Sequence, residues 1–190
     1  HARFTGWSGQ GLRVLGVATR VLGEEQVDRN VEHDLDFRGY LLFQDPPKEG
    51  VTSAVKALSD LGVRLKIVTG DSPLVARHLA DAVGVPLEKV LTGEQLDEMK
   101  DEALWREAER VDLFASVDPN QKERILLALK RTGHVVGFLG DGINDAPALH
   151  AADAGISVQG AADVAREAAD FVLLERDLDV VRRGIVAGRT

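Results

Sequence analysis

The sequence contains no cysteine and a single methionine, Met99, and these absences exclude several kinds of chemistry. Without cysteine there is no disulfide, no thiolate nucleophile and no cysteine-ligated zinc, which fits a reducing compartment. No uncharged apolar run approaches the roughly 18 residues that a membrane-spanning helix requires, so we expect this chain itself to be soluble. The start, His1-Ala2-Arg3-Phe4, has neither an initiator methionine nor the apolar core of a signal peptide. We therefore expect a piece of a longer protein.

Basic residues are scarce relative to acidic ones. The 190 residues include 31 Asp and Glu against 23 Lys and Arg, which gives a formal net charge of -8. Such a chain lacks the basic stripe that binds a phosphate backbone and the basic amphipathic segment that binds an anionic membrane. We expect neither a nucleic-acid partner nor direct membrane contact. What remains, 44% hydrophobic and 28% charged residues, is the composition of a soluble globular domain.

From about residue 50 onward, short β-rich segments alternate with amphipathic helical patterns. The predicted strands cover residues 63–69, 111–117, 135–139, 155–158 and 171–174. Ser72-Pro73 and Asp118-Pro119 are helix-opening pairs, and Thr92 with Gln95 has capping-box spacing before a long helix that is predicted to reach about Arg110. This alternation predicts a doubly wound α/β domain, in which helices cover both faces of a parallel sheet.

Residues 1–44 have a different pattern, with a charged link before a predicted strand over 37–43. Asp45-Pro46-Pro47 follows, and two consecutive prolines form a stiff, extended hinge. We therefore expect a domain boundary here, between residues 1–44 and 45–190.

Three motifs follow predicted strands, where chemistry gathers in doubly wound sheets. They are Thr69-Gly70-Asp71, Lys122 near the start of a helix, and the run Gly140-Asp141-Gly142-Ile143-Asn144-Asp145. Together they offer a hydroxyl, freed backbone amides, an ammonium group and carboxylates, and we expect them to converge on one crevice. This inventory suits a phosphoryl group with Mg²⁺, an ion held by carboxylates, phosphate and water. No nucleophile or general base is evident among them.

In that interpretation, Asp141 and Asp145 are the candidate Mg²⁺ ligands. Thr69 and the amide of Gly70 would bond phosphoryl oxygens, and Lys122 would neutralise charge in the transition state. Ordinary structural interpretations stand beside these: Thr-Gly-Asp as a turn, Lys122 as a solvated side chain, and Asp-Gly as a hairpin tip. The hairpin interpretation is weakened because the residues from Ala146 onward open a helix instead of a return strand.

In combination the motifs resemble the cation-transporting P-type ATPases. The resemblance is carried, in order, by Asp45-Pro46-Pro47-Lys48, Thr69-Gly70-Asp71, Asp118-Pro119-Asn120-Gln121-Lys122 and the ten-residue run from Gly140 to Leu149. It covers nearly the whole chain. Residues 1–44, which include Gly11-Leu12-Arg13-Val14-Leu15, are similar to the end of the family's nucleotide-binding domain and its hinge strand. Residues 45–190 resemble most of the phosphorylation domain, which has the haloacid dehalogenase fold.

The subtype resemblance is closest to the bacterial magnesium-transporting ATPases, with copper and proton transporters as alternatives. It is carried by Phe138-Leu139, by residues 155–158 and by residues 170–175. The resemblance implies a transporter that uses ATP and Mg²⁺ and holds this part on the cytoplasmic side of the cell membrane. The implied partners are the transmembrane, actuator and remaining nucleotide-binding parts of the same polypeptide.

The resemblance also implies roles for individual residues. Asp141 would bind the catalytic Mg²⁺ with help from Asn144 and Asp145. Phosphate or nucleotide would be contacted by Thr69, Gly70, Asp71 and Lys122.

One departure from the family pattern matters as much as the match. The Asp-Lys-Thr-Gly-Thr motif, whose aspartate is phosphorylated in the family, is absent from this sequence. The chain alone should therefore be inert. In the haloacid dehalogenase fold the strand bearing that aspartate lies between the strands that end here at Thr69 and Leu139. We expect its place to be filled by residues 1–44, by a neighbouring chain or by closing of the sheet, because buried backbone groups need partners.

Two other functions stay open on the sequence alone. A free-standing Mg²⁺-dependent phosphatase of the same fold is disfavoured because it also needs the missing strand. A non-catalytic module that binds nucleotide or Mg²⁺ without turnover would retain the motifs and lack the nucleophile.

Overall fold

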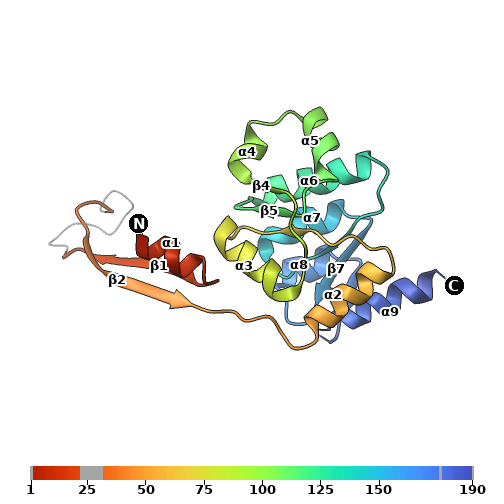
Figure 1. The fold of residues 1–190 in the computed structure, drawn as a ribbon, viewed down its shortest axis with the longest axis horizontal. Helices are drawn as coiled ribbons and strands as arrows, with labels where there is room; N and C mark the ends of the chain where they lie inside the picture. Colours follow the sequence, from red (N-terminus) through yellow and green to blue (C-terminus); the bar gives the residue numbers. More distant parts are fainter. Residues whose placement is uncertain (1, 22–31, 176, 190) are drawn as a thin grey trace.

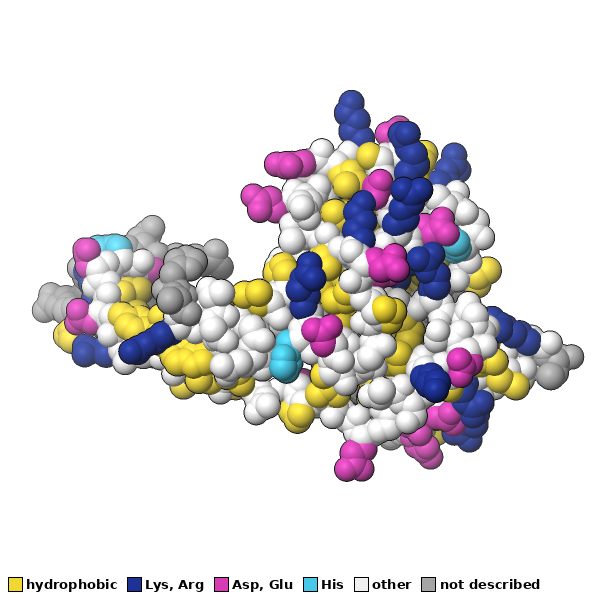
Figure 2. Space-filling view, viewed as in Figure 1, with side chains coloured by type: hydrophobic (Ala, Val, Ile, Leu, Met, Phe, Trp, Pro, Cys, Tyr) yellow, Lys and Arg dark blue, Asp and Glu magenta, His cyan; other side chains and the backbone are white. Residues whose placement is uncertain are grey.

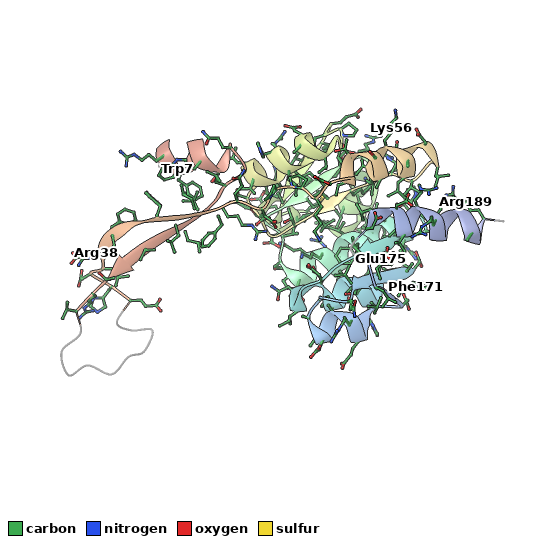
Figure 3. The ribbon with its side chains drawn as sticks, turned by 90° about the horizontal axis from the view of Figure 1, so that it is seen from below. Trp7, Arg38, Lys56, Phe171, Glu175 and Arg189 are labelled. Atoms are coloured by element: carbon green, nitrogen blue, oxygen red, sulfur yellow. The ribbon has the colours of Figure 1, made fainter. Side chains whose placement is uncertain are left out.

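The structure, a computed structural model, describes residues 2–21, 32–175 and 177–189, which form an extended arm and a larger body (Figure 1). The arm contains helix α1 (Ala2–Ser8) and the antiparallel strands β1 (Arg13–Thr19) and β2 (Asp36–Phe43). The predicted strand over 37–43 is confirmed by β2, whereas β1 was not predicted. Trp7 of α1 points toward the hairpin and meets the ring of Tyr40 edge to face, with 5.3 Å between centroids (Figure 3).

The body alternates strands with helices, as predicted. Its strands are β3 (Ile67–Val68), β4 (Val90–Thr92), β5 (Leu113–Ala115), β6 (Gly137–Leu139), β7 (Ala154–Val158) and β8 (Phe171–Leu173). Its helices are α2 (Val51–Asp60), α3 (Pro73–Val83), α4 (Gly93–Asp97), α5 (Asp101–Ala108), α6 (Pro119–Arg131), α7 (Ala146–Ala151), α8 (Asp163–Ala168) and α9 (Leu178–Gly188), with a 3₁₀ turn (Ile143–Asp145) before α7. Within the described residues, no helix has both the length and the apolar character needed to cross a membrane.

The predicted caps explain where the helices begin. Asp118 and Gln121 form a capping box at α6, and Thr92 and Gln95 form another at α4. The single long helix predicted from there to about residue 110 is wrong. The chain divides into α4 and α5 because Lys100 has an extended backbone (φ -71°, ψ 154°), which ends one helical path and opens the next.

The body's strands form two parallel sheets, in the orders β3-β5-β4 and β6-β7-β8. The largest hydrophobic cluster extends across both sheets, because buried Phe114 of β5 and Phe138 of β6 belong to it and Val68 of β3 packs against it. Helix α6 packs against α7 and so links the two halves. The parallel α/β class predicted from the sequence is confirmed, with the strands divided between two sheets.

β3 and β6 each lie at the end of a sheet. These are the two strands expected to flank the absent central strand. Two of the three suggested ways to fill its place are wrong for the described residues. The arm does not fill it, because β1 and β2 pair with each other in a separate antiparallel sheet. Nor does the sheet close, because among the described strands β3 pairs only with β5, and β6 pairs only with β7.

Candidate functional site

The loop after β6 is folded tightly around the carboxylate of Asp145. Its Oδ2 accepts hydrogen bonds from the amides of Asp141, at 3.2 Å, and Gly142, at 3.0 Å. Gly140 makes this approach possible, because a Cβ at that position would lie 2.6 Å from the Cβ of Asp145. Asp145 is 9% exposed, so this carboxylate is an internal part of the loop.

Lys122, near the start of α6, reaches the other oxygen of that carboxylate. Its Nζ lies 2.6 Å from Oδ1 of Asp145, and each side chain is 12% exposed. The interpretation of Lys122 as a solvated surface residue is therefore wrong, because the loop covers it. The ion pair joins the helix that follows β5 to the loop that follows β6, so the carboxyl ends of both sheets lie on the same side of the body.

Asp141 is in a different situation from Asp145. It is exposed, and its carboxylate has no hydrogen-bond or ion-pair partner among the described residues. Its backbone carbonyl accepts from the amide of Ala162 at 2.9 Å, which holds the loop against the start of α8. Asn144 is also exposed. The loop is therefore fixed from within, while the Asp141 carboxylate stays accessible.

A cavity of about 350 Å³ lies beside Asp141, at the carboxyl ends of β6, β7 and β8. The starts of α2 and α9 close its other sides. Its apolar lining comes from the ends of these strands and the first residues of the two helices, and charged side chains also line it. The lining includes Lys48, Val51, Leu139, Asp141, Val158, Leu173, Asp177 and Leu178. This place, beyond the carboxyl ends of parallel strands, is where ligands bind in α/β sheets.

Thr69-Gly70-Asp71 follows β3, as predicted, and is held by the neighbouring strand β5. The amide of Thr69 donates to the carbonyl of Phe114 at 2.9 Å, and the Thr69 carbonyl accepts from Val117 at 3.1 Å. The hydroxyl of Thr69 accepts from the amide of Asp71 at 3.1 Å, which tightens the turn. The hydroxyl thus has a role in the turn, as the ordinary interpretation of this motif predicts, and Gly70 is exposed.

Two residues near this turn were missed by the sequence reasoning. Ser116 has a left-handed backbone (φ 54°), and its amide donates to the carbonyl of Asp71 at 2.8 Å. Arg13 of the arm donates to Oδ2 of Asp71 at 2.7 Å, and this hydrogen bond and the negative charge of Asp71 raise the pKa of Arg13. No local pattern identifies Ser116. Arg13 lies in a segment that carries the family resemblance, but its partner is 58 positions away.

The structure thus brings Lys122, Asp141 and Asp145 together. Thr69, Gly70 and Asp71 lie on the next strand end, connected to them through the segment that runs from the end of β5 into α6. In the part of the chain that the structure describes, no hydrogen bond or ion pair joins residues 69–71 to the loop 140–145. Convergence of the two loops on one ligand remains a prediction.

Comparison with known proteins assigns the chain to a family. The family model described as haloacid dehalogenase-like hydrolase matches residues 4–153. The chain belongs to the haloacid dehalogenase-like hydrolases. This agrees with the resemblance read from the motifs and with the parallel α/β fold.

Several curated relatives of this chain are named as transport ATPases. It is 52% identical over 182 residues, or 95% of its length, to the magnesium-transporting ATPase, P-type 1 of Escherichia coli K12, and covers 20% of that protein. It is 53% identical over 182 residues to the protein of the same name from Salmonella typhimurium 14028s, again covering 95% of the chain and 20% of the relative. Calcium-transporting ATPase 1 of Saccharomyces cerevisiae is 37% identical over 187 residues, with the same two shares. The chain thus spans about a fifth of the length of these relatives.

The donor set of the loop can be tested against Mg²⁺. Among the described residues, no group of three or more histidines, aspartates or glutamates is placed to hold a metal ion. Mg²⁺, however, is commonly held by one or two carboxylates together with phosphate oxygens and water. The accessible Asp141 fits that mode. Both oxygens of Asp145 have partners, so its assignment as a direct ligand stays a prediction that requires one of these contacts to exchange.

Proposed function

We propose that this chain is the part of an ATP-driven cation transporter of the P-type that binds Mg²⁺ and phosphate during aspartyl-phosphate chemistry, with magnesium as the transported ion. The observation that carries the proposal is the loop 140–145. Asp145 is held by Lys122 and by two amides, and this leaves Asp141 as the accessible carboxylate beside the cavity. The names of the similar proteins, magnesium-transporting ATPases, support the transport function and the ion.

In this proposal, Asp141 would hold Mg²⁺, and the ion would neutralise negative charge on the phosphoryl group. Thr69 and the amide of Gly70 bond the transferred phosphoryl group, and Lys122 supplies positive charge near it. Charge spreads over the equatorial oxygens in phosphoryl transfer, so a fixed cation and preorganised amides lower the barrier. Asp71 and Asn144 are proposed as further contacts to phosphate or nucleotide.

The nucleophile is proposed to lie outside residues 1–190, on an aspartate of the longer polypeptide. The chain alone would then bind without turnover. We further propose that residues 1–44 complete a nucleotide-binding domain and that residues 45–190 are most of a phosphorylation domain. The transmembrane, actuator and remaining nucleotide-binding parts are the partners in this arrangement, and this part would lie on the cytoplasmic side of the membrane.

The test is a pair of variants in the longer polypeptide, assayed for Mg²⁺-dependent ATP hydrolysis. Asp141→Ala removes the accessible carboxylate, and we expect a loss of about 100-fold or more, the usual effect of removing a group that stabilises transition-state charge. Asp81→Ala is the matched control, because Asp81 is exposed on α3; its activity should stay within about twofold of the parent's, as surface substitutions away from a site have small effects. Equal activities of the two variants would contradict the proposal.

A further inference from the structure

A groove of about 330 Å³ lies between helices α5 and α6, and it shares no residue with the cavity beside Asp141. One wall is a stripe of α6 residues spaced three or four positions apart, which places their side chains on the same side of the helix. The other wall comes from α5. The lining residues are Asp101, Trp105, Arg124, Leu127, Ala128 and Arg131. The groove is thus separate from the candidate site.

The floor of the groove is apolar. Ala128 is buried and belongs to the largest hydrophobic cluster, and Trp105 packs against that cluster. Leu127, by contrast, is 50% exposed. Single exposed apolar residues are common on protein surfaces, but this leucine lines the same hollow as a half-buried tryptophan. The groove therefore offers apolar surface to another apolar side chain.

The two arginines of the groove differ in what they bind. The guanidinium of Arg124 donates to the carboxylate of Asp101 at 2.8 Å and to two backbone carbonyls near the end of α4. Arg131 has no hydrogen-bond or ion-pair partner in the described part of the chain, and its guanidinium lies over the ring of Trp105, 5.4 Å from the centroid. The charge of Asp101 is thereby neutralised inside the groove, whereas Arg131 keeps an unpaired positive charge.

Trp105 adds a second free donor. Its indole N–H has no hydrogen-bond partner among the described residues, and it is not sealed from water. Guanidinium and indole N–H groups donate hydrogen bonds and accept none. Both therefore require acceptors, and the unpaired positive charge favours a carboxylate. Figure 2 shows Lys and Arg side chains over the part of the body that contains α5 and α6, in a chain whose net charge is -8.

We infer that this groove, defined by Trp105, Leu127 and Arg131, binds an acidic segment of a partner protein. The segment places one apolar side chain on Leu127 and Ala128 and a neighbouring carboxylate on Arg131. Tryptophan and arginine are among the residues that most often carry the binding energy of protein interfaces. Stacking on Trp105 also restricts the guanidinium before the partner arrives, so less freedom is lost when the carboxylate binds.

A small molecule and a second copy of this chain fit the groove less well. Sites for small molecules enclose most of their ligand, whereas Leu127 leaves half of its surface in water. A second copy offers Leu35, which is 46% exposed and lies between two aspartates. Those carboxylates already bond to His33 and Arg38. The occupant that fits is therefore a segment of another protein whose carboxylates are free.

Fluorescence of Trp105 tests the inference. The chain has two tryptophans, so Trp7→Phe leaves Trp105 as the sole one and keeps an aromatic ring against Tyr40. The probe is the synthetic peptide acetyl-Asp-Asp-Phe-Leu-Asp-amide, and the control peptide has lysine in place of each aspartate. We expect the acidic peptide to change the emission with a Kd on the order of 0.1–1 mM, because the groove is small, and the lysine peptide to have no effect. Equal responses to the two peptides, or none to either, would overturn the inference.

Two charge-reversing variants of the Trp7→Phe chain identify the groove as the site. Arg131→Glu removes the unpaired cation and should weaken binding of the acidic peptide at least about tenfold. Arg77→Glu is the matched control, because Arg77 is exposed on α3 and the change in net charge is the same. Its Kd should stay within about twofold of the parent's, since salt screens distant charges. Equal Kd values for the two variants would contradict the groove as the site.

The other occupants are distinguished by two further measurements. The longer polypeptide should bind the same peptide, with the NMR signals of the peptide as the readout. Loss of binding there would mean that another segment of the same polypeptide covers the groove. Emission of Trp105 that changes with the concentration of residues 1–190, and no longer does so in Arg131→Glu, would identify a second copy. Either result would overturn the inference.

The inference does not depend on the proposed function, and one variant separates the two. Asp141→Ala should abolish ATP hydrolysis in the longer polypeptide and leave peptide binding unchanged, because Asp141 does not line the groove. Arg131→Glu should weaken peptide binding and leave ATP hydrolysis within about twofold of the parent's, as surface substitutions away from a site have small effects. Peptide binding that falls with Asp141→Ala would place the peptide in the candidate site and contradict the inference.

Discussion

The two parallel sheets of the body differ in how completely this chain covers them. In the central strand of the first sheet, Leu113, Phe114 and Ala115 are all 0% exposed, so both faces are covered. In the central strand β7 of the second sheet, Ile156 and Val158 are only half-buried, and on its edge strands Leu139 is 46% exposed and Phe171 is 60% exposed. All of these side chains are apolar, so the difference does not come from composition. It shows where the chain supplies the packing for a sheet and where it leaves an apolar face open.

The open face and the open edges occur together. Leu139 belongs to both, because its side chain lies on the exposed face and its backbone points away from β7. Parallel sheets are normally buried on both faces. The second sheet therefore has an apolar surface that the described part of this chain leaves open.

The difference in burial between the two sheets can be tested with one substitution in each. Phe114→Ala should lower the free energy of unfolding by about 3–5 kcal/mol, because it leaves a cavity in a close-packed core. Phe171→Ala should cost less than about 1 kcal/mol, because this side chain is largely in water. Urea unfolding of residues 1–190 measures both, and Phe114→Leu replaces Phe114→Ala if the latter does not fold. Similar costs at the two positions would remove the distinction.

The ion pair that connects the two halves should have the next largest effect. Asp145→Asn keeps the shape of the side chain but leaves Lys122 without its charged partner, at a cost of about 2 kcal/mol in the free energy of unfolding. Adding Lys122→Met to that variant should restore part of the loss, because the unpaired cation is gone. A double-mutant cycle by urea unfolding measures the coupling, and simple additivity of the two substitutions would contradict it.

A smaller effect on stability is expected at Asp153, whose carboxylate bonds to the residue before β6. The amide of Val136, at 2.9 Å, and the ammonium of Lys130 both bond to Asp153 and lower the pKa of its carboxyl group. A carboxyl group whose pKa is depressed by folding contributes stability above its unfolded pKa of 3.8 and loses it as the pH falls through the folded value. Stability should thus decline in acid below about pH 4, and Asp153→Asn should decline less steeply. Identical pH profiles would show that Asp153 contributes nothing.

Much of the body can be predicted from local sequence. The apolar runs at β5 to β8 and the caps at Ser72 and Asp118 locate most of its strands and helices, because each signal is contained within a few neighbouring residues. β1 was missed because its short run includes Gly16 and Ala18, which weaken a strand pattern. β4 was missed because only Val90 and Leu91 precede Thr92, which the sequence assigned to the capping box of the next helix.

The residues of the candidate site could be predicted from the sequence, but the contacts between them could not. Lys122 and Asp145 were both selected by motif, yet their pairing spans 23 positions, and the link from Arg13 to Asp71 spans 58. Such contacts depend on how the strands are ordered, which no local pattern encodes. The division into two sheets follows from the same cause, because the order of the strands is set by pairings between segments that lie far apart in the sequence.

The most direct test of the central claim, that this chain carries the phosphate and Mg²⁺ groups without the nucleophile, is phosphorylation of residues 1–190 alone. The chain is incubated with labelled ATP and Mg²⁺, quenched in acid and tested for a hydroxylamine-sensitive acyl phosphate. The account predicts no label on this chain and a label on the longer polypeptide treated in the same way. A clear label on residues 1–190 would mean that one of its own carboxylates is the nucleophile and would contradict the account.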